Sequence, residues 1–322
     1  MTKVIFKFLF STICVGFAIQ TSAKESRVAI ANFGPHPALE QVIKGFKTGL
    51  ADSGFKEGET LEYEYLDASF DPSIVAQMLT TLEATNPDLL MTVTTPVTQA
   101  AMRAIRNPNI PIVFAPVTDP VDAGLVPSWN GGSERFTGAS NLQSMETVFE
   151  FAQDLLGEVK SVGLLYNPGD ANDVVNVSYA EAAAKKMDIE LVALSVESQA
   201  DISVRVDGLA ETDVLYVIPS SMLQPALPAI ATVARRIDLP VINASPLGVA
   251  DGQILASMSV SWFDVGREAG LRAARVLNGE PISSIDIFRP SPEDHSPFIS
   301  SIRLKETGMT LSDALADCQC LR

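Results

Sequence analysis

The sequence predicts an α/β fold with two lobes, in which parallel sheets are covered by helices and a ligand cleft separates the lobes. Short apolar runs alternate with amphipathic helical stripes along the chain, a pattern typical of parallel sheets that are buried on both faces. This alternation occurs twice, on either side of an irregular stretch over 116–135 that is rich in Pro, Gly and Asp. The 322 residues suffice for about two domains. We therefore expect 116–135 to cross between two lobes.

The first half is predicted to contain four strands and three helices. The strands are expected at 28–33, 61–66, 88–93 and 112–115. Apolar residues at helical spacing follow the first two strands, over 39–50 and 74–82. The third helix is expected to open at Thr95-Pro96. Thr95 can cap it, and Pro96 suits its first turn because proline has no amide hydrogen to leave unbonded.

The second half repeats the pattern. Its strands are expected at 161–166, 189–194, 213–218 and 240–243, and its helices near 172–187, 201–210, 222–237 and 262–278. The late strand over 254–260 and the helix after it are expected to return the chain to the first lobe. The lobes are then predicted to comprise 24–139 with about 262–290, and about 140–261 with 291–322.

The N-terminus has the pattern of a signal peptide. Lys3 and Lys7 provide a positive start, 8–19 is apolar, and small residues end the segment at Ala23. A retained membrane anchor is the alternative, but an apolar run this short falls below the ~20 residues that a bilayer needs. We expect residues 1–23 to be removed and the mature protein to be periplasmic or secreted.

Composition excludes several function classes. There are 39 acidic and 23 basic residues, for a formal net charge of −16, which argues against nucleic acid as a partner. Three cysteines and two histidines are too few for a structural zinc cluster, so neither metal nor cofactor is expected. Outside the N-terminal segment the cysteines are Cys318 and Cys320, which belong either to a frayed tail without function or to a local or intermolecular disulfide.

Candidate chemistry lies in the loops that follow the strands. Ligands of open parallel sheets bind at the carboxyl ends of the strands. The loops there are rich in small hydroxyl and amide side chains, at 34–37, 94–96, 117–120, 167–173, 219–221 and 243–245. Most lead into a helix N-terminus, where free amides and a partial positive charge suit a carboxylate. Each loop alone could hold simple helix caps, but several on one rim favour a binding cleft.

Signatures of catalysis are missing from the sequence. It contains no G-x-S-x-G, no P-loop, no G-x-G-x-x-G and no H-E-x-x-H motif. His295 is expected in a solvated loop, whereas His36 follows the first strand and could cap a helix, pack, or contact a ligand. Asp170 and Asp173 are interpreted first as caps. We expect no enzymatic activity, with a secreted hydrolase that uses His36 as the alternative.

Many short segments together resemble a known family. They lie at 36–39, 45–46, 49–50, 54–55, 87–88, 95–96, 110–114, 118–120, 124–125, 137–138, 163–168 and 277–281, with single matches at 58, 172 and 266. In order and spacing they resemble the solute-binding proteins of a group of ABC importers whose better-known members bind tryptophan, tyrosine or phenylalanine. One departure is Asp173, because family members often carry a serine after the residue that matches Asn172.

The resemblance implies a type I periplasmic binding protein: two Rossmann-like lobes, three crossings and a ligand between the lobes. Such a monomeric protein closes on a small solute, here an aromatic or other hydrophobic amino acid, and delivers it to a membrane permease. A protein that senses a ligand for a membrane receptor would use the same sites.

We assign candidate ligand contacts by the chemistry of a free amino acid. Its carboxylate could be met by Thr94, Thr95, Ser220 and Ser221. Its ammonium could be met by Asp119, Asp173 and Asp264. An aromatic side chain could pack on Phe33, His36, Phe114, Tyr166 and Trp262. The remaining candidates on the rim are Thr118, Asn167, Asn172 and Asn243.

Overall fold

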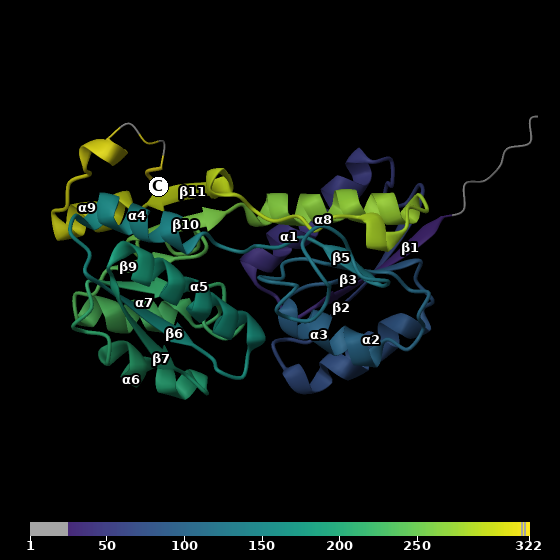
Figure 1. Cartoon of the computed structure of the whole chain (residues 1–322), viewed down its shortest axis with the longest axis horizontal. Helices are drawn as coiled ribbons and strands as arrows, with labels where there is room; N and C mark the ends of the chain where they lie inside the picture. The colour runs from purple at the N-terminus through teal and green to yellow at the C-terminus, as the bar shows by residue number, and fades with distance from the viewer. Residues whose placement is uncertain (1–24, 317, 319) are drawn as a thin grey trace, which may run out of the picture.

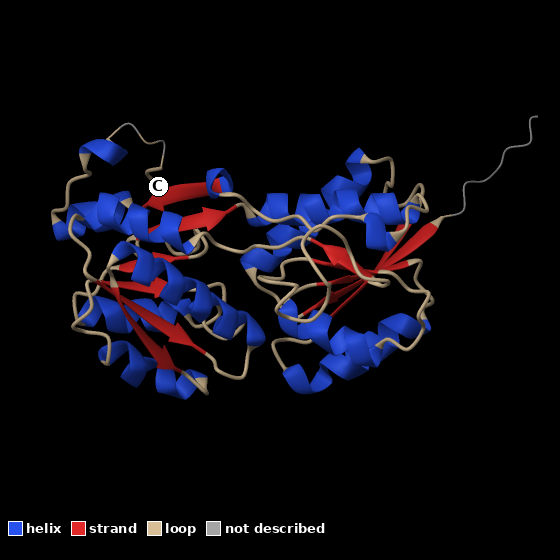
Figure 2. Cartoon of the chain, in the orientation of Figure 1, coloured by secondary structure: helices blue, strands red, loops and turns tan. Residues whose placement is uncertain are grey.

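The protein has two α/β lobes joined side by side, which confirms the predicted fold class (Figure 1). The computed structural model describes residues 25–316, 318 and 320–322, so the predicted signal peptide over 1–23, with its cleavage near Ala23, lies outside the described residues. In each lobe the strands form one sheet with helices against its faces (Figure 2). Among the described residues no helix is long and apolar enough to cross a bilayer.

The first lobe contains a five-stranded parallel sheet of order β2-β1-β3-β4-β5. Its strands are β1 Ser26–Asn32, β2 Leu61–Asp67, β3 Leu89–Thr92, β4 Ile112–Phe114 and β5 Phe136–Gly138. Its helices are α1 Pro37–Asp52, α2 Val75–Ala84, α3 Thr95–Ala104 and α8 Trp262–Leu277. Residues of α1 and α8 enter one hydrophobic cluster and residues of α2 and α3 another, so the sheet has a core on each face.

Glycines bring α1 and α8 into close contact. A Cβ atom at Gly45 or Gly49 of α1 would overlap the backbone of α8, and one at Gly266 or Gly270 of α8 would overlap the backbone of α1. The two helices therefore lie against each other along their length (Figure 1). This packing holds α8 on the first lobe although it follows strands of the second.

The second lobe contains a six-stranded sheet of order β11-β10-β9-β8-β6-β7, in which only the edge strand β11 is antiparallel. Its strands are β6 Ser161–Tyr166, β7 Glu190–Ser195, β8 Val214–Val217, β9 Val241–Asn243, β10 Ala256–Val260 and β11 His295–Ile299. Its helices are α4 Met145–Leu156, α5 Ala171–Met187, α6 Ile202–Asp207, α7 Leu227–Arg236 and α9 Ser301–Thr307.

The predicted crossing over 116–135 is wrong. Val117, Leu125 and Val126 are buried in the core of the first lobe, so this stretch stays there and ends in β5, a strand that the sequence analysis missed. Its irregularity reflects a long connection between neighbouring parallel strands. The chain instead crosses to the second lobe between β5 and α4, which starts in the second core.

The late strand also differs from the prediction. β10 pairs with β9 in the second sheet, so only α8 returns the chain to the first lobe. Residues 285–288 then contact the first lobe through hydrogen bonds to Gly132 and Ser140, before β11 rejoins the second sheet. The chain thus passes between the lobes three times. The lobe boundaries at 139, 261 and 290 stay predictions.

His295 is buried, not solvated as predicted. It opens β11, where its Nε2 accepts the amide hydrogen of Ser144 at 2.9 Å and its Nδ1 lies 3.0 Å from the carbonyl oxygen of Ser291. Burial lowers the pKa of the imidazole. β11 has no clear strand pattern in the sequence, because Pro297 interrupts the alternation of buried and exposed residues.

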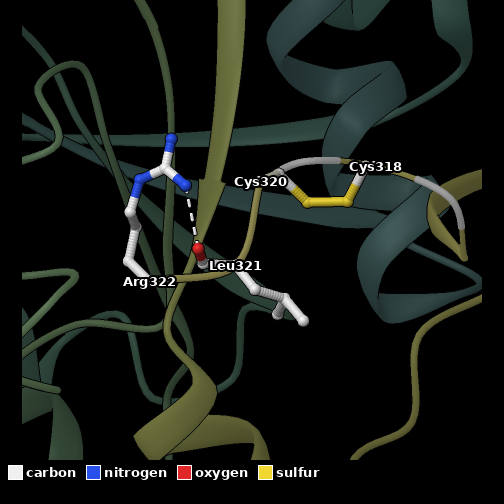
Figure 3. Close-up of a disulfide and its surroundings, with 4 residues drawn as sticks. All are labelled: Cys318, Cys320, Leu321 and Arg322. Carbon is white, nitrogen blue, oxygen red and sulfur yellow. Dashed lines mark hydrogen bonds between the residues drawn. A yellow bond between two sulfur atoms is a disulfide. The ribbon is translucent and has the colours of Figure 1, made fainter.

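The C-terminal tail is docked, not frayed. Cys318 and Cys320 form a disulfide, and Cys320 is buried against the second-lobe core (Figure 3). The Arg322 amide donates to the Ile299 carbonyl oxygen at 2.9 Å, and Ile299 donates to Cys320 at 2.8 Å. The tail therefore extends the β11 edge by a short bridge at Leu321.

Candidate functional site

A narrow cavity of about 40 Å³ lies between the two lobes. It is lined from the first lobe by Phe33, His36, Leu39, Phe70, Thr94, Thr95, Pro116 and Trp262, from the crossing by Asn141, and from the second lobe by Asn172, Pro219, Ser220, Ser221, Gln224 and Pro225. Sites for small molecules are usually lined by apolar surface, with a small number of polar groups that orient the ligand. The lining has the usual character of such sites, a mostly apolar surface with a few polar groups.

Several helices begin at the cavity. His36 is the N-cap of α1, Thr94 is the N-cap of α3, and Trp262 is the first residue of α8. From the second lobe, Asn172 stands in the first turn of α5. The first amide groups of a helix have no partner within the helix and carry partial positive charge. Their convergence favours an anionic group such as a carboxylate in the cavity.

His36 offers a hydrogen-bond donor to the cavity. Its Nδ1 accepts the amide hydrogen of Ala38 at 3.2 Å, which places the proton of the neutral ring on Nε2. Burial lowers the pKa of His36, while the Gln224 backbone and the charge of Glu40 partly oppose this, so the neutral ring is favoured. Nε2 is buried and makes no hydrogen bond of good geometry, although it faces the Gln224 backbone across the cleft. His36 therefore acts both as helix cap and as a free donor.

Thr94 is held in an unusual backbone conformation. Its φ of 83° and ψ of 155° lie in a region that is essentially restricted to glycine. Its buried Oγ1 has no partner and does not cap α3. Thr95, predicted as the cap, is instead the first residue inside the helix, because the chain turns one residue earlier.

Trp262 adds a third unpartnered group. Its indole Nε1, which can only donate, is buried without a partner in the same lining. Buried polar groups without partners are costly, so they are rare in proteins. Three of them, on His36, Thr94 and Trp262, meet in one cavity. They can serve a ligand with hydrogen-bond acceptors.

The apolar wall is built around two phenylalanines. Phe33 and Phe70 pack edge to face, with ring centroids 5.8 Å apart and planes at 83°. Gly34 leaves room for this pair, since a Cβ there would come within 2.7 Å of the Phe70 ring. Phe70 was missed from the sequence because it lies in an irregular turn after β2, where its φ is 63°. Its position at the carboxyl end of a strand could have identified it.

The second-lobe wall is hydrogen-bonded within itself. The side-chain nitrogen of Asn172 donates to the Pro219 carbonyl oxygen at 2.8 Å and to the Asp173 carboxylate at 3.2 Å. The Ser220 hydroxyl donates to Asp173 at 2.8 Å and accepts the amide hydrogens of Met222 and Leu223 at 3.2 Å. These side chains therefore have fixed orientations.

Asp173 lies behind this wall and outside the cavity lining. It is fully buried. Besides the bonds from Asn172 and Ser220, its carboxylate accepts the backbone amide hydrogen of Asn167 at 2.8 Å. Burial, and secondarily the charge of Asp170, raise the pKa of Asp173. Asp170 is the N-cap of α5, as the sequence analysis expected.

Two hydrogen bonds connect the lobes beside the cavity. The Thr118 hydroxyl donates to the side-chain oxygen of Asn172, and the Tyr179 hydroxyl donates to Asp119 at 2.8 Å. Burial, together with the neighbouring Asp119 carboxylate, raises the pKa of Tyr179 to about 12. The structure therefore has its lobes closed over the cavity.

The lining includes eight of the sixteen candidate ligand residues: Phe33, His36, Thr94, Thr95, Asn172, Ser220, Ser221 and Trp262. It also includes seven that the sequence analysis did not consider, namely Leu39, Phe70, Pro116, Asn141, Pro219, Gln224 and Pro225. Most of the latter are apolar or proline residues, which a sequence does not distinguish from core or turn.

The other eight candidates lie outside the lining: Phe114, Thr118, Asp119, Tyr166, Asn167, Asp173, Asn243 and Asp264. Phe114 belongs to the first-lobe core, and Tyr166 packs on the second. The Asn243 side chain bonds to Gln224 at 2.7 Å, and Asp264 is exposed on α8. Thus no acid assigned to the ligand ammonium reaches the cavity. Within the described part of the chain no group of three potential metal ligands occurs either.

Comparison with known proteins gives a consistent result. A family model described as ABC transporter substrate binding protein matches residues 27–318. A protein of Clostridioides difficile named tyrosine-binding protein is 29% identical over 267 residues, which cover 83% of this chain and 76% of that protein. A conserved domain protein of Vibrio cholerae has a similar crystal structure, with a TM-score of 0.86 at 30% identity over 93% of this chain and 100% of that one.

Two further similar structures differ in their ligand state. A domain of Streptococcus pneumoniae in complex with L-Trp has a TM-score of 0.85 at 23% identity, and covers 93% of this chain and 100% of its own. A ligand-free, open substrate-binding protein of Clostridium difficile has a TM-score of 0.71 at 25% identity, with coverage of 92% and 99%.

Proposed function

This chain belongs to the ABC transporter substrate-binding protein family, and from that premise we propose that it captures an aromatic or other hydrophobic amino acid between its lobes. In this proposal the protein is a periplasmic monomer, released by cleavage near Ala23, that closes on the amino acid and delivers it unchanged to a membrane permease. A secreted hydrolase, the alternative from the sequence, is not favoured by the family match.

One observation carries the proposal: three buried, unpartnered polar groups belong to residues that line one aromatic-walled cavity. The Nε2 of His36, the Oγ1 of Thr94 and the Nε1 of Trp262 can all donate. A carboxylate accepts several such bonds, and helix N-termini favour its charge. Phe33 and Phe70 supply a surface for an aromatic side chain.

Two relatives support the choice of ligand class. The Clostridioides difficile relative is named for tyrosine, and the Streptococcus pneumoniae structure contains L-Trp. The closed lobes of this chain agree with the higher TM-score against the L-Trp complex than against the open, ligand-free structure. Hydrogen bonds from Thr118 and Tyr179 across the cleft would form as the lobes close on the ligand.

The ligand ammonium would be met by neutral oxygens, because the described lining contains no Asp or Glu. Recognition of the amino acid would then rest mainly on its carboxylate and its side chain. We expect indole-3-propionate, which lacks the ammonium, to bind within about tenfold of L-Trp, on the scale of one neutral hydrogen bond.

Titration calorimetry with a panel of amino acids tests the proposal. L-Trp, L-Tyr and L-Phe should bind saturably with one site per chain, whereas L-Asp and L-Lys, matched in their backbone groups, should not. Mass spectrometry of the released ligand should show that it is unchanged. No saturable binding of any aromatic or hydrophobic amino acid, or turnover that is lost in His36→Ala, would contradict the proposal.

A further inference from the structure

We infer that Asp173 is a positioning residue for ligand capture: its ionised carboxylate orients the Asn172 side chain for closure of the lobes, so that closure requires the ionised form. This inference deepens the proposed function and rests on it. Asp173 itself stays behind the cavity wall and acts through Asn172 and Ser220, both of which line the cavity.

The Asp173 carboxylate is the acceptor in each of its three hydrogen bonds. One oxygen accepts from the Asn167 amide and from the Ser220 hydroxyl, each at 2.8 Å, and the other accepts from the Asn172 side-chain nitrogen at 3.2 Å. Ser220 has no freedom to reverse its bond. Its oxygen already accepts two amide hydrogens, so its own proton must go to Asp173.

The Asp173 carboxylate and the Pro219 carbonyl oxygen together decide which way the Asn172 side-chain amide faces. The Asn172 nitrogen has acceptors on two sides, Asp173 and the Pro219 carbonyl oxygen. Its oxygen must then face the first lobe, where it accepts the proton of Thr118. A reversed amide would oppose its oxygen to both acceptors. A series of hydrogen bonds thus runs from the buried carboxylate of Asp173 through Asn172 to Thr118, at the contact that joins the lobes.

Protonation of Asp173 conflicts with this arrangement. A carboxyl O–H directed at any of these three contacts would oppose a donor. Burial and the nearby Asp170 raise the pKa of Asp173 and bring this conflict toward neutral pH. Burial therefore favours protonated Asp173, whereas closure of the lobes requires the ionised form.

Other titratable groups on the contacting elements are already engaged. Asp170 caps α5, and its pKa is raised chiefly by burial. Across the cleft, Asp119 accepts the Tyr179 hydroxyl and two amide hydrogens, and His36 is held neutral by burial. Asp170 accepts the backbone amide hydrogen of Asn172 at 3.0 Å, whereas Asp173 is the carboxylate that accepts from the Asn172 side chain.

Proton linkage follows from this assignment. Because closure requires ionised Asp173, closure on a ligand should release a proton over the pH range in which Asp173 of the open protein is partly protonated. Affinity should rise as pH rises through that range. Above it, affinity should become constant.

The experiment is a titration with L-Trp between about pH 5.5 and about pH 8, a range that spans a raised carboxyl pKa. Wild-type protein should gain about tenfold in affinity across the range. Asp173→Asn should lose that gain and bind about tenfold more weakly at about pH 8. The NH2 group of the new side chain would face one of the donors that now bond to the carboxylate. Asp170→Asn is the matched control: it keeps a helix cap, keeps the rise in affinity, and moves its midpoint to lower pH since a repelling charge is gone.

A measurement on unaltered protein keeps the inference testable if Asp173→Asn fails to fold. Calorimetry with L-Trp in phosphate and in Tris, whose ionisation enthalpies differ, should reveal net proton release at the midpoint. The inference is overturned if Asp173→Asn retains both the affinity and the pH profile, or if wild-type binding releases no proton. Absence of any L-Trp or L-Tyr binding by wild type would instead overturn the proposed function.

Discussion

The two walls of the cavity differ in their hydrogen bonds. On the first-lobe wall, buried polar atoms of His36, Thr94 and Trp262 have no partner. On the second-lobe wall, the side chains of Asn172, Ser220 and Gln224 are bonded to their own lobe. The same cavity is thus bounded by one wall that needs a partner and one that does not.

This difference assigns a task to each wall. Unpartnered buried groups cost free energy in the absence of a ligand, so the first lobe gains most when a ligand arrives. The second wall is already ordered and loses little conformational freedom on closure. We expect the first lobe to bind the ligand directly, while the second lobe closes over it as a preformed surface.

The largest effect should come from removing two donors of the first wall together. In Thr94→Val with Trp262→Phe, the affinity for L-Trp should fall about a hundredfold, because each lost bond to a carboxylate costs about tenfold or more. Tyr216→Phe is the matched control, since Tyr216 also has a buried hydroxyl without a partner but lies in the second-lobe core. Calorimetry checks both, and equal losses in the control and the double variant would refute the contrast between the walls.

Thr94→Gly should separate stability from binding. Glycine tolerates the φ of 83°, so the free energy of unfolding of the variant should be higher by about 1 kcal/mol. It also lacks the hydroxyl, so L-Trp should bind about tenfold more weakly. Urea unfolding and calorimetry measure the two quantities. A variant that is both less stable and equally tight in binding would show that Thr94 is neither strained nor a contact.

The stability of the ligand-free protein should fall as pH rises past the ordinary carboxyl range. The folded protein holds protons on Asp170 and Asp173 that the unfolded chain has already lost, because burial raises both pKa values. Asp173→Asn should flatten this fall by about 1 kcal/mol, the equivalent of roughly one pKa unit. Urea unfolding at a series of pH values gives the slope. An unchanged slope would mean that Asp173 titrates alike in the folded and unfolded states.

The smallest effect should come from the bond between Tyr179 and Asp119, which lies outside the cavity. Tyr179→Phe should weaken L-Trp binding only about threefold, since it removes one neutral-to-charged bond of the closed form and touches no ligand. Its effect should appear mainly as faster dissociation in stopped-flow fluorescence. A loss as large as that of the first-wall variant would move the site of recognition away from the cavity.

The architecture could largely be predicted from the sequence, because burial on both faces of parallel sheets leaves a local pattern. The α/β class and most strands follow from apolar runs such as 161–166. The crossing was misplaced because a long irregular connection inside one lobe has the same composition as a linker. The helix packing of α8 on α1 depends on glycines such as Gly45 and Gly266, which meet only in three dimensions.

The site was predictable only in part. Thr94 and His36 could be identified since they follow strands, and in parallel sheets those ends share one edge. The acids were misassigned because sequence does not show whether a carboxylate faces a ligand or its own loop. Asp173 and Asp119 both face protein donors. Phe70 was missed since its loop carries no helical or strand pattern.

A crystal structure of the protein with L-Trp tests the central claim most directly. The account predicts density for the amino acid in the cavity, with its carboxylate within hydrogen-bond distance of Thr94 and His36 or Trp262 and its ring against Phe33 and Phe70. It also predicts that the second-lobe bonds of Asn172 stay as they are. Ligand density elsewhere, or a carboxylate held only by the second lobe, would contradict the account.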